Sequence, residues 1–520
     1  MNKILNIIGE RAFLNLSKTD LVICLWYVYV LISAWTYTAY PCSHTIVGAT
    51  YMLSLYLFVR IIFSISHVRD VYVVFGIILW TIFELGYGVM QLVEGSSNHY
   101  LYPMTGTFLN PGPYAAGLAL GLVMLCQYRR ETGNGILIYK GVTTRHIIEI
   151  VILCFVIILP ATWSRAAMLS VALCLCMIYW ENVRKWIWWV ICAGIAVIVV
   201  MYLVKSGSAN GRFAVNIIAM QCVTDSPIIG NGIGGFFHAY AEKTAQMSVS
   251  GLPFDAMAVD VLDYAFNDMM LIAVEQGLVG LMFAVILLTF TFRALYKKSR
   301  CLMYGLLALV VFSLFSYPFE LLPYQIIAVI IIAYSANTDE GIKINVFVVV
   351  AVAVSLAILP LDYAKAKKKA EDDYRMMSGM TDKAFIDDYY ELLPSLDDNR
   401  NFLFDFGKAL SLQGRYNDSN AMLRMGTLVS NDPMFYVVQG NNYKEMMAYD
   451  KAEAMYWKAY NVMPNRLYPL YKLMLLYQDI GEKGKAAIMA RHIIGFKEKV
   501  VSPATKDMKK EAKQLIKEQI

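Results

Sequence analysis

Four short clusters of glycine, asparagine, proline and charged residues lie between or beside the long apolar segments of this sequence. Residues of these types close to helix ends fix tight turns, and a charged residue there needs a polar cavity or an anion as its partner. The clusters span residues 86–117, 162–167, 210–236 and 264–277. Any chemistry of this chain is expected at these four places.

Two arginines are the strongest candidates for binding an anion. Arg165 lies at a turn between two apolar segments, and a charge there costs roughly a few kcal/mol if it faces lipid. We therefore expect it to face a polar cavity or an anion. Arg212 follows a glycine at the opening of the third cluster. The simpler alternatives are an interfacial arginine that reaches lipid phosphate for Arg165 and a solvated charge for Arg212.

The remaining polar groups admit structural explanations as well as functional ones. The glycine-rich run 227–236 superficially resembles a dinucleotide fingerprint, but no βαβ context surrounds it, so a tight turn that packs a loop is the better interpretation. Glu84 and Glu275 lie within or beside apolar segments and are functional candidates by default, and pairing with another polar group would explain them equally well. The cysteines and histidines show no metal-ligand spacing, so we predict no metal.

The elements between these clusters are apolar and long enough to span a membrane. Hydrophobic residues make up 58% of the sequence and charged residues 16%, whereas soluble globular proteins have roughly half and a quarter. Blocks of about twenty apolar residues have the length that crosses a bilayer core of roughly 30 Å. The sequence therefore predicts an all-α, polytopic membrane helical bundle of about eleven spans. The expected spans are residues 20–38, 46–66, 71–93, 112–127, 146–163, 166–180, 186–204, 269–292, 301–317, 321–336 and 344–361.

The positions of lysine and arginine predict the orientation of these spans. If the N-terminus is cytoplasmic and the spans alternate, sixteen Lys and Arg residues before the C-terminal tail lie inside. Four lie on the opposite side, namely Arg165, Lys205, Arg212 and Lys243. This is the positive-inside bias of membrane proteins. It predicts that the stretches 94–111 and 205–268, and everything after about residue 362, face the periplasm.

The C-terminal tail is more charged than the preceding sequence and contains an internal repeat. Charge density rises after Lys365, and Tyr416 and Tyr449 recur at the same interval as Gly407 and Gly440. Alanines 421, 454 and 487 share this interval. A period near 34 residues with small residues where paired helices touch resembles tetratricopeptide repeats, which usually bind peptides or proteins. We expect a transmembrane domain over 1–362, a linker over 363–401 and α-helical, tetratricopeptide-like repeats over 402–520.

The clusters also form an ordered set. In order they read Gly88-Val-Met-Gln91, Gly106-Thr-Phe-Leu-Asn110, Ser164-Arg165-Ala166, Gly211-Arg212, the run from Pro227 to Phe236 with Gly232 and Gly234, and Asn267-Asp268 followed by Glu275-Gln-Gly277. The order of these pieces is more informative than any one of them. Over about residues 20–340 it resembles the O-antigen ligase and O-antigen polymerase superfamily of membrane glycosyltransferases.

One departure from that family concerns the residue before Asn267. The family commonly has a histidine there, which is usually given the role of activating the acceptor, whereas this chain has Phe266. The change either shifts the role to a neighbour or marks a subgroup with different chemistry. His44, His99 and His238 are expected on the same side of the membrane, and the role is not carried over to any of them.

The resemblance implies that a glycan moves from undecaprenyl diphosphate to an acceptor hydroxyl, with no cofactor. Two arginines in one cavity can hold phosphate oxygens and stabilise the charge that grows on the diphosphate. The expected catalytic residues are Arg165, Arg212, Asp268 and Glu275, of which the two carboxylates are candidate bases. The expected substrate-binding residues are Gln91, Asn110, Ser164, Gly232, Gly234 and Asn267.

The identity of the acceptor divides the expected activities. If the acceptor is lipid A core, the protein is an O-antigen ligase. If the acceptor is a protein, it is a protein O-oligosaccharyltransferase, and if the acceptor is a growing glycan, it is a polymerase. Membrane lipids and a protein bound by the repeats are further expected partners, and no nucleic acid is expected. The other classes are a non-catalytic scaffold of glycan assembly and a transporter, although no inverted repeat marks a transporter. We expect a multi-pass protein of the bacterial inner membrane, with the N-terminus cytoplasmic and the repeats periplasmic.

Overall fold

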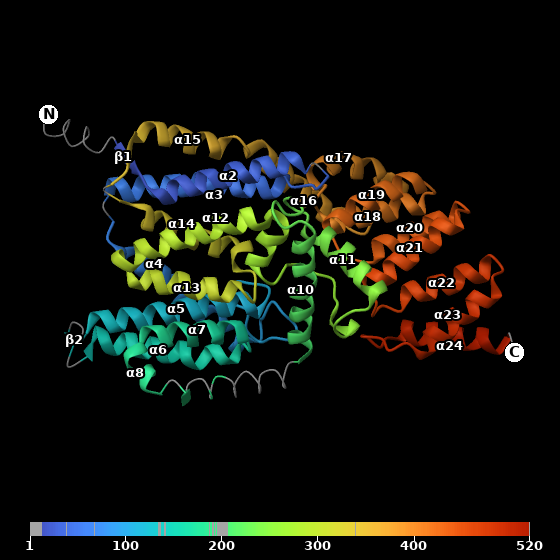
Figure 1. Ribbon diagram of the computed structural model, residues 1–520, viewed down its shortest axis with the longest axis horizontal. Helices are drawn as coiled ribbons and strands as arrows, with labels where there is room; N and C mark the ends of the chain where they lie inside the picture. The colour runs from blue at the N-terminus through green and yellow to red at the C-terminus, as the bar shows by residue number, and fades with distance from the viewer. Residues whose placement is uncertain are drawn as a thin grey trace.

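Helices make up most of the chain in the computed structural model (Figure 1). The structure describes residues 13–518 except 38, 67, 134–136, 140, 141, 187, 190, 191, 193, 195–205 and 339. Within these residues the sheet structure consists of two antiparallel strand pairs, β1 with β4 and β2 with β3. The strands are β1 Phe13–Leu16, β2 Leu137–Tyr139, β3 Val142–Thr143 and β4 Ile342–Asn345. The predicted all-α fold class is confirmed.

Long apolar helices form a bundle on the N-terminal side of the molecule (Figure 1). Six of them are long and apolar enough to cross a membrane, and the bent pair Arg165–Ile178 with Trp180–Trp186 would make a seventh. The six are α2 Lys18–Thr36, α3 Ser43–Ser66, α4 Asp70–Glu94, α6 Thr144–Ala161, α12 Asp268–Lys298 and the stretch Val346–Met377, which contains α15 Val346–Ile358 and α16 Leu361–Met377. The bent pair is α7 Arg165–Ile178 with α8 Trp180–Val183 and η1 Arg184–Trp186. These helices indicate an integral membrane protein.

A central helix organises the bundle. α5 (Pro111–Thr132) is buried at every residue from Pro113 to Gln127 and packs against α4, α6, α7 and α13. Two shorter apolar helices complete the packing, α13 Arg300–Ser313 and α14 Leu322–Ala336, which are joined by η3 Pro318–Glu320. The number of crossings, about eleven, stays a prediction, and the expected span 186–204 falls mostly outside the described residues.

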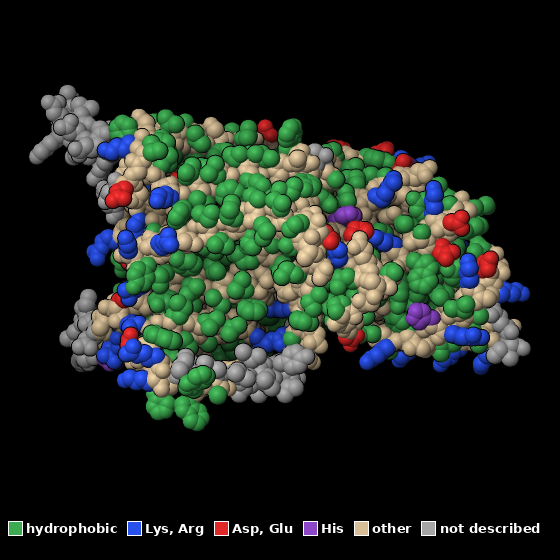
Figure 2. Space-filling view, in the orientation of Figure 1, with side chains coloured by type: hydrophobic (Ala, Val, Ile, Leu, Met, Phe, Trp, Pro, Cys, Tyr) green, Lys and Arg blue, Asp and Glu red, His purple; other side chains and the backbone are tan. Residues whose placement is uncertain are grey.

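The surface of the bundle has the pattern expected of a membrane protein. Hydrophobic side chains cover the face of the bundle that Figure 2 shows, whereas Lys and Arg side chains gather at the end where β1 and β2 lie. Large apolar side chains on α2, α4 and α6 are exposed, among them Leu25, Phe83 and Ile157. Exposed apolar surface of this extent is stable where lipid, rather than water, covers it.

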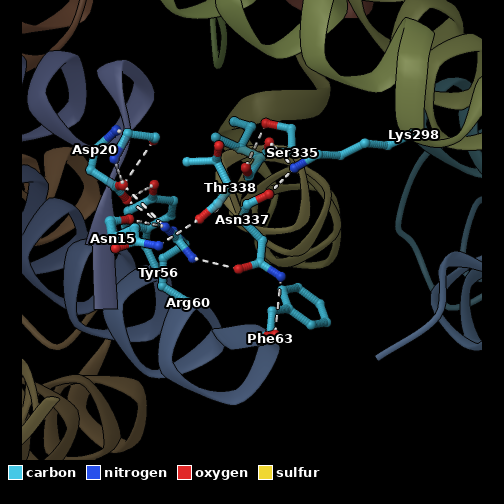
Figure 3. Close-up of polar contacts among 11 residues, drawn as sticks. Asn15, Asp20, Tyr56, Arg60, Phe63, Lys298, Ser335, Asn337 and Thr338 are labelled. Carbon is cyan, nitrogen blue, oxygen red and sulfur yellow. Dashed lines mark hydrogen bonds and ion pairs between the residues drawn. The ribbon is translucent and has the colours of Figure 1, made fainter. Parts of the chain in front are cut away.

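A buried ion pair joins several elements at the charged end of the bundle (Figure 3). Arg60 and Asp20 are 1% and 2% exposed, and Arg60 Nε lies 3.1 Å from Asp20 Oδ1. The hydroxyl of Tyr56 donates to the same carboxylate, and Arg60 also donates to the carbonyl of Asn15 at 2.8 Å and to the side chain of Asn337 at 3.4 Å. The pair therefore connects α2 and α3 with the β1–β4 ladder and with the end of α14.

Polar helices and a long connection lie at the opposite end of the bundle. α10 (Ser206–Asp225) and α11 (Phe236–Ser250) lead through η2 (Ala256–Ala258) into α12. α11 packs against α10 on one side and against the C-terminal helices α19 and α21 on the other (Figure 1). The cavity described below lies in this region.

Three consecutive helical hairpins form the C-terminal part. η4 Lys383–Phe385 and α17 Ile386–Leu396 lead into the hairpins α18 Arg400–Leu412 with α19 Tyr416–Val429, α20 Met434–Glu445 with α21 Tyr449–Val462, and α22 Tyr468–Asp479 with α23 Lys483–Gly495, followed by α24 Pro503–Glu518. We call α18–α23 the C-terminal hairpins. Gly407 and Gly440 lie where paired helices cross, because a Cβ at either would come within 2.7 Å or 2.5 Å of the facing side chain. The predicted helical repeats are confirmed.

Candidate functional site

A cavity of about 590 Å³ opens between the apolar bundle and the C-terminal part. Its walls come from the loop after α4, the start of α5, the α6–α7 turn, the first half of α10 and the connection before α12. It brings together four of the ten residues that the sequence put forward: Asn110, Ser164, Arg165 and Arg212. We call it the arginine cavity.

The α6–α7 turn places Arg165 at the cavity. Ser164 is the N-cap of α7 and its hydroxyl accepts a hydrogen bond from the backbone N–H of Ala167 at 3.4 Å, so Arg165 is the first helical residue. The hydroxyl of Thr162 donates to the carbonyl of Leu159 at 2.7 Å and accepts from the N–H of Ser164 at 3.3 Å. These contacts hold the intervening Trp163 at a φ of 54°, a conformation that is rare without glycine.

Arg212 reaches the same cavity from α10. Its Nη1 donates to the carbonyl of Phe315 at 2.6 Å, and its guanidinium lies over the ring of Phe266, 5.5 Å from the centroid. Burial lowers the pKa of Arg212, and the neighbouring charge of Arg165 lowers it further. Because arginine stays protonated well above neutral pH, two like charges share one partly desolvated cavity. An anion is the ligand that this arrangement favours.

Asn110 is in the cavity wall, and it also starts α5. It is the N-cap of that helix, with its side chain accepting from the N–H of Gly112 at 3.0 Å. Pro111 follows at the first helical position, where a missing N–H costs nothing. The combination of asparagine and proline therefore fixes the re-entry that the sequence predicted.

Gln91 supports the loop before α5 from behind and does not line the arginine cavity. It is 1% exposed, its carbonyl oxygen accepts from the N–H groups of Thr105 and Gly106 at 2.9 Å, and its amide donates to the carbonyl of Gly106 at 2.9 Å. Glu84 holds Thr107 in the same way, because its carboxylate accepts from the N–H of Thr107 at 3.1 Å and from its hydroxyl at 2.6 Å. Both side chains position the loop that ends in Asn110.

The glycine-rich run fits into a break in α12. The helix is interrupted at Gly277, which has φ 63° and ψ −161°. Across the break, the N–H groups of Asn231 and Gly232 donate to the carbonyls of Val274 and Glu275 at 2.8 and 3.0 Å. In return, the N–H of Leu278 donates to the carbonyl of Pro227 at 2.8 Å. The run thus satisfies backbone groups that the broken helix leaves open.

Glu275 and Gly234 belong to the same joint. The Glu275 carboxylate accepts from the N–H of Phe236 at 3.4 Å, at the first turn of α11, where a negative charge is favourable. Gly234 has a φ of 78° and precedes Gly235, the N-cap of α11. Gly232, Gly234 and Glu275 therefore orient α11, and none of them is in the cavity wall. Their assignment to substrate binding or catalysis stays a prediction.

Asn267 and Asp268 start α12 beside the cavity rather than in its wall. Asn267 caps the helix by accepting from the N–H of Met270 at 3.1 Å, and its amide donates to Asn216 at 3.1 Å. Asp268 is 4% exposed, and its carboxylate accepts from the N–H of Phe319 at 3.1 Å. Asp268 and Glu275 both belong to α12, but neither of them is in the cavity wall.

The cavity also contains titratable residues that the motifs did not single out, namely His99, Tyr100, Tyr102, Asp260 and Lys499. The Nδ1 of His99 accepts from the N–H of Leu101 at 3.1 Å, so the neutral ring carries its proton on Nε2. His99 can therefore donate to an anion from Nε2. The sequence singled out the polar stretch 94–111, which contains His99 and Tyr102. No sequence pattern connects Lys499 with this stretch.

Comparison with known proteins gives one family match. Residues 150–285 match the family model described as O-antigen ligase. This range contains Ser164, Arg165, Arg212, the glycine-rich run and the start of α12, and it supports an enzyme with ligase- or polymerase-like function in general. No curated protein matches the chain.

A solved structure, "Crystal structure of MamA protein", is similar to a part of the chain. The identity is 21%, and the match covers 30% of this chain and 90% of that one, with a TM-score of 0.24. A TM-score this low carries no argument about fold or function.

Proposed function

We propose that this protein transfers a glycan from undecaprenyl diphosphate to an acceptor hydroxyl on the periplasmic side of the bacterial inner membrane. The observation that carries the proposal is that Arg165 and Arg212, from separate helices, meet in one cavity. The family match over 150–285 supports the same class of reaction. The gathering of Lys and Arg at the far end of the bundle supports a cavity that faces the periplasm (Figure 2).

The proposed reaction is a displacement at the anomeric carbon of the donor. The acceptor oxygen forms a bond to that carbon, and the bond from the carbon to the diphosphate oxygen breaks. The diphosphate leaves with the bonding electrons, and the acceptor hydroxyl gives up its proton to a base. The energy that drives transfer is already stored in the diphosphate bond, so no nucleotide is required.

The two arginines stabilise the departing diphosphate. Each planar guanidinium can hold two phosphate oxygens, and a cavity that is partly shielded from water strengthens that interaction. The Nε2–H of His99 adds a further hydrogen-bond donor at the same cavity. The arginines repel one another when the cavity holds no anion, and the negative charge that develops on the leaving group relieves this repulsion.

Asp260 is the acidic residue in the wall of the cavity, and we assign it the role of the base that takes the proton from the acceptor hydroxyl. It takes this role in place of Asp268 and Glu275, because backbone amides hold those two carboxylates outside the wall. Phe266 occupies the position of the family histidine and has no titratable group. Its ring instead supports Arg212.

The C-terminal hairpins belong to the proposal as tetratricopeptide-like repeats on the periplasmic side. Their period and the glycines at the helix crossings support this assignment. With this tail, the chain has 1–362 as its transmembrane part, 363–401 as a linker and 402–520 as repeats.

The decisive experiment replaces the two arginines in the host. In cells that carry Arg165→Ala or Arg212→Ala, we expect glycan transfer to fall about 10²–10³-fold at a normal protein level, with lipid-linked glycan accumulating. Gels of lipopolysaccharide and of periplasmic glycoproteins distinguish a ligase, a polymerase and a protein oligosaccharyltransferase. Arg145→Ala, which changes an arginine of an exposed ion pair outside the cavity wall, is the matched control. Unchanged transfer in both variants would favour a non-catalytic scaffold.

A further inference from the structure

The segment 256–263, which we call the wall segment, forms one side of the arginine cavity. Five of its residues are in the cavity wall, namely Met257, Ala258, Asp260, Val261 and Leu262. It connects α11 with α12, and it has one short 3-10 turn of its own, η2. A segment with so little regular structure needs partners elsewhere for its backbone groups.

Two buried asparagines of the C-terminal hairpins supply these partners. Asn431, which is fully buried between α19 and α20, accepts from the N–H of Leu262 at 2.9 Å and donates to the carbonyl of Asp260 at 2.9 Å. Asn465, 2% exposed between α21 and α22, donates to the carbonyls of Ala256 at 3.0 Å and Val259 at 2.7 Å. The two asparagines lie one repeat period apart, so equivalent connections between successive hairpins hold neighbouring parts of the wall segment.

Charged side chains from the same C-terminal part hold the end and the middle of the segment. Arg400 donates to the carbonyl of Leu262 at 3.2 Å and pairs with Asp263. Lys499, after α23, donates to the carbonyl of Val259 at 3.2 Å and to the carboxylate of Asp260 at 2.9 Å. Lys499 is itself in the cavity wall, so the C-terminal part contributes a cation to the site directly.

A separate contact docks the C-terminal hairpins on α11. Ala241 and Ala245 of α11 are buried in one apolar cluster with Tyr436 and Tyr456, and Lys458 pairs with Glu242. This contact is outside the cavity wall, so docking of the C-terminal hairpins and support of the wall segment can be separated by mutation.

We propose that the C-terminal hairpins are a positioning element of the transfer site. They hold the wall segment through Asn431 and Asn465 so that it faces the two arginines, and Lys499 fixes the carboxylate of Asp260 at the cavity. This inference rests on the proposed function for its catalytic meaning. The physical support of the segment by the C-terminal hairpins does not depend on the reaction.

The first test measures the support directly in the purified full-length protein. Val261→Cys provides a thiol in the wall segment for labelling with a maleimide, and mass spectrometry follows this site separately from the native cysteines. When Asn431→Ala and Asn465→Ala are both introduced into the Val261→Cys protein, the labelling rate should rise at least ten-fold, because the wall segment loses four hydrogen bonds. Lys444→Ala, which breaks an ion pair within the C-terminal hairpins, and Lys458→Ala, which breaks the ion pair with Glu242 of α11, should leave the rate unchanged. An unchanged rate in the double asparagine variant would overturn the inference.

The second test connects the support with the site and uses a variant that does not disturb buried groups. Lys499→Met should lower the affinity of the full-length protein for inorganic pyrophosphate about three- to ten-fold, and Lys499→Arg should restore it. Equal affinity in Lys499→Met and the unchanged protein would overturn the direct contribution of Lys499. If Arg165→Ala and Arg212→Ala leave transfer unchanged, the proposed function fails, while the labelling rates still decide whether the C-terminal hairpins hold the segment.

Discussion

The guanidinium of Arg212 lies over the face of the Phe266 ring, with its carbon 5.5 Å from the ring centroid. Phe266 has a φ of 55°, which residues other than glycine rarely adopt. Its ring packs edge-on against Tyr317, which in turn stacks on Tyr264 at 3.8 Å. The position at which the O-antigen ligase family commonly has histidine therefore holds an aromatic support for an arginine.

Removal of this ring should weaken anion binding. A cation–π contact contributes about 0.5–2 kcal/mol, so Phe266→Leu should lower the affinity for inorganic pyrophosphate roughly 2- to 30-fold. Phe266→Tyr keeps the ring and should bind nearly as well as the unchanged protein. Titration calorimetry on the purified protein measures both, with Phe83→Leu on the exposed surface of α4 as the control. Equal affinity in Phe266→Leu would show that the ring does not support Arg212.

The sequence predicted the apolar bundle and the helical repeats because each depends on a local pattern, whereas the meeting of Arg165 with Arg212 in one cavity was expected from the resemblance to the O-antigen ligase superfamily. Apolar blocks of fixed length indicate membrane helices, and a charge at a turn between them indicates a polar cavity. Gly407 and Gly440 likewise lie at helix crossings, as predicted. Alanines 421, 454 and 487, however, are half-buried or exposed, whereas Ala452 and Ala486 are buried. The period was correct, but the alanines with the clearest recurrence are not those at the helix interface.

The rest of the site depends on contacts between distant segments, which local patterns do not contain. Lys499 reaches the cavity through the fold of the whole C-terminal part, more than 200 residues after Asp260 in the chain. Glu275 is a candidate base because a carboxylate beside an apolar segment is a functional candidate by default. In the structure its carboxylate accepts from the N–H of Phe236 at the N-terminus of α11, and its role as a base stays a prediction.

The joint between the glycine-rich run and α12 should not tolerate a side chain. A Cβ at Gly277 would lie 2.3 Å from the carbonyl oxygen of Ile228, and one at Gly230 would lie 2.4 Å from the backbone of Glu275. Both glycines also have positive φ values. We expect Gly277→Ala or Gly230→Ala to lower the free energy of unfolding by at least about 2 kcal/mol or to prevent folding.

Thermal unfolding in detergent and the yield of folded protein measure this effect. Gly76→Ala is the matched control, because it lies in the apolar helix α4 and a Cβ there meets nothing within 4 Å. That variant should be as stable as the unchanged protein or slightly more stable, since alanine favours helix. Similar melting temperatures for all three variants would contradict the interlocked joint.

The buried ion pair at the other end of the bundle should be sensitive to loss of one partner. Arg60→Met leaves Asp20 charged and almost fully buried, so we expect a loss of about 3–5 kcal/mol in the free energy of unfolding. The double variant Asp20→Asn with Arg60→Met should recover part of this loss. Glu149→Gln, which breaks two exposed ion pairs, should cost far less, because water screens both pairs. Equal effects of Arg60→Met and Glu149→Gln would contradict the network in Figure 3.

Glu320, in the connection between α13 and α14, should make stability depend on pH. Burial is the main cause that raises its pKa from 4.5 to about 8, and the nearby carboxylates of Asp268 and Glu275 contribute to the same rise. At a pH between 4.5 and about 8, the Glu320 carboxyl is protonated in the folded state and ionised in the unfolded state. The free energy of unfolding should therefore fall as pH rises from about 5 to about 8 and level off above that, because a carboxylate with a raised pKa is destabilising once it ionises.

Glu320→Gln isolates this contribution, because glutamine has a similar shape and no charge to gain. We expect the melting temperature of the unchanged protein to drop between about pH 5 and about pH 8, and that drop to be clearly smaller in Glu320→Gln. Glu94→Gln, at the exposed end of α4, should leave the drop as it is. The same pH dependence in Glu320→Gln and in the unchanged protein would mean that Glu320 is ionised in the folded state at neutral pH.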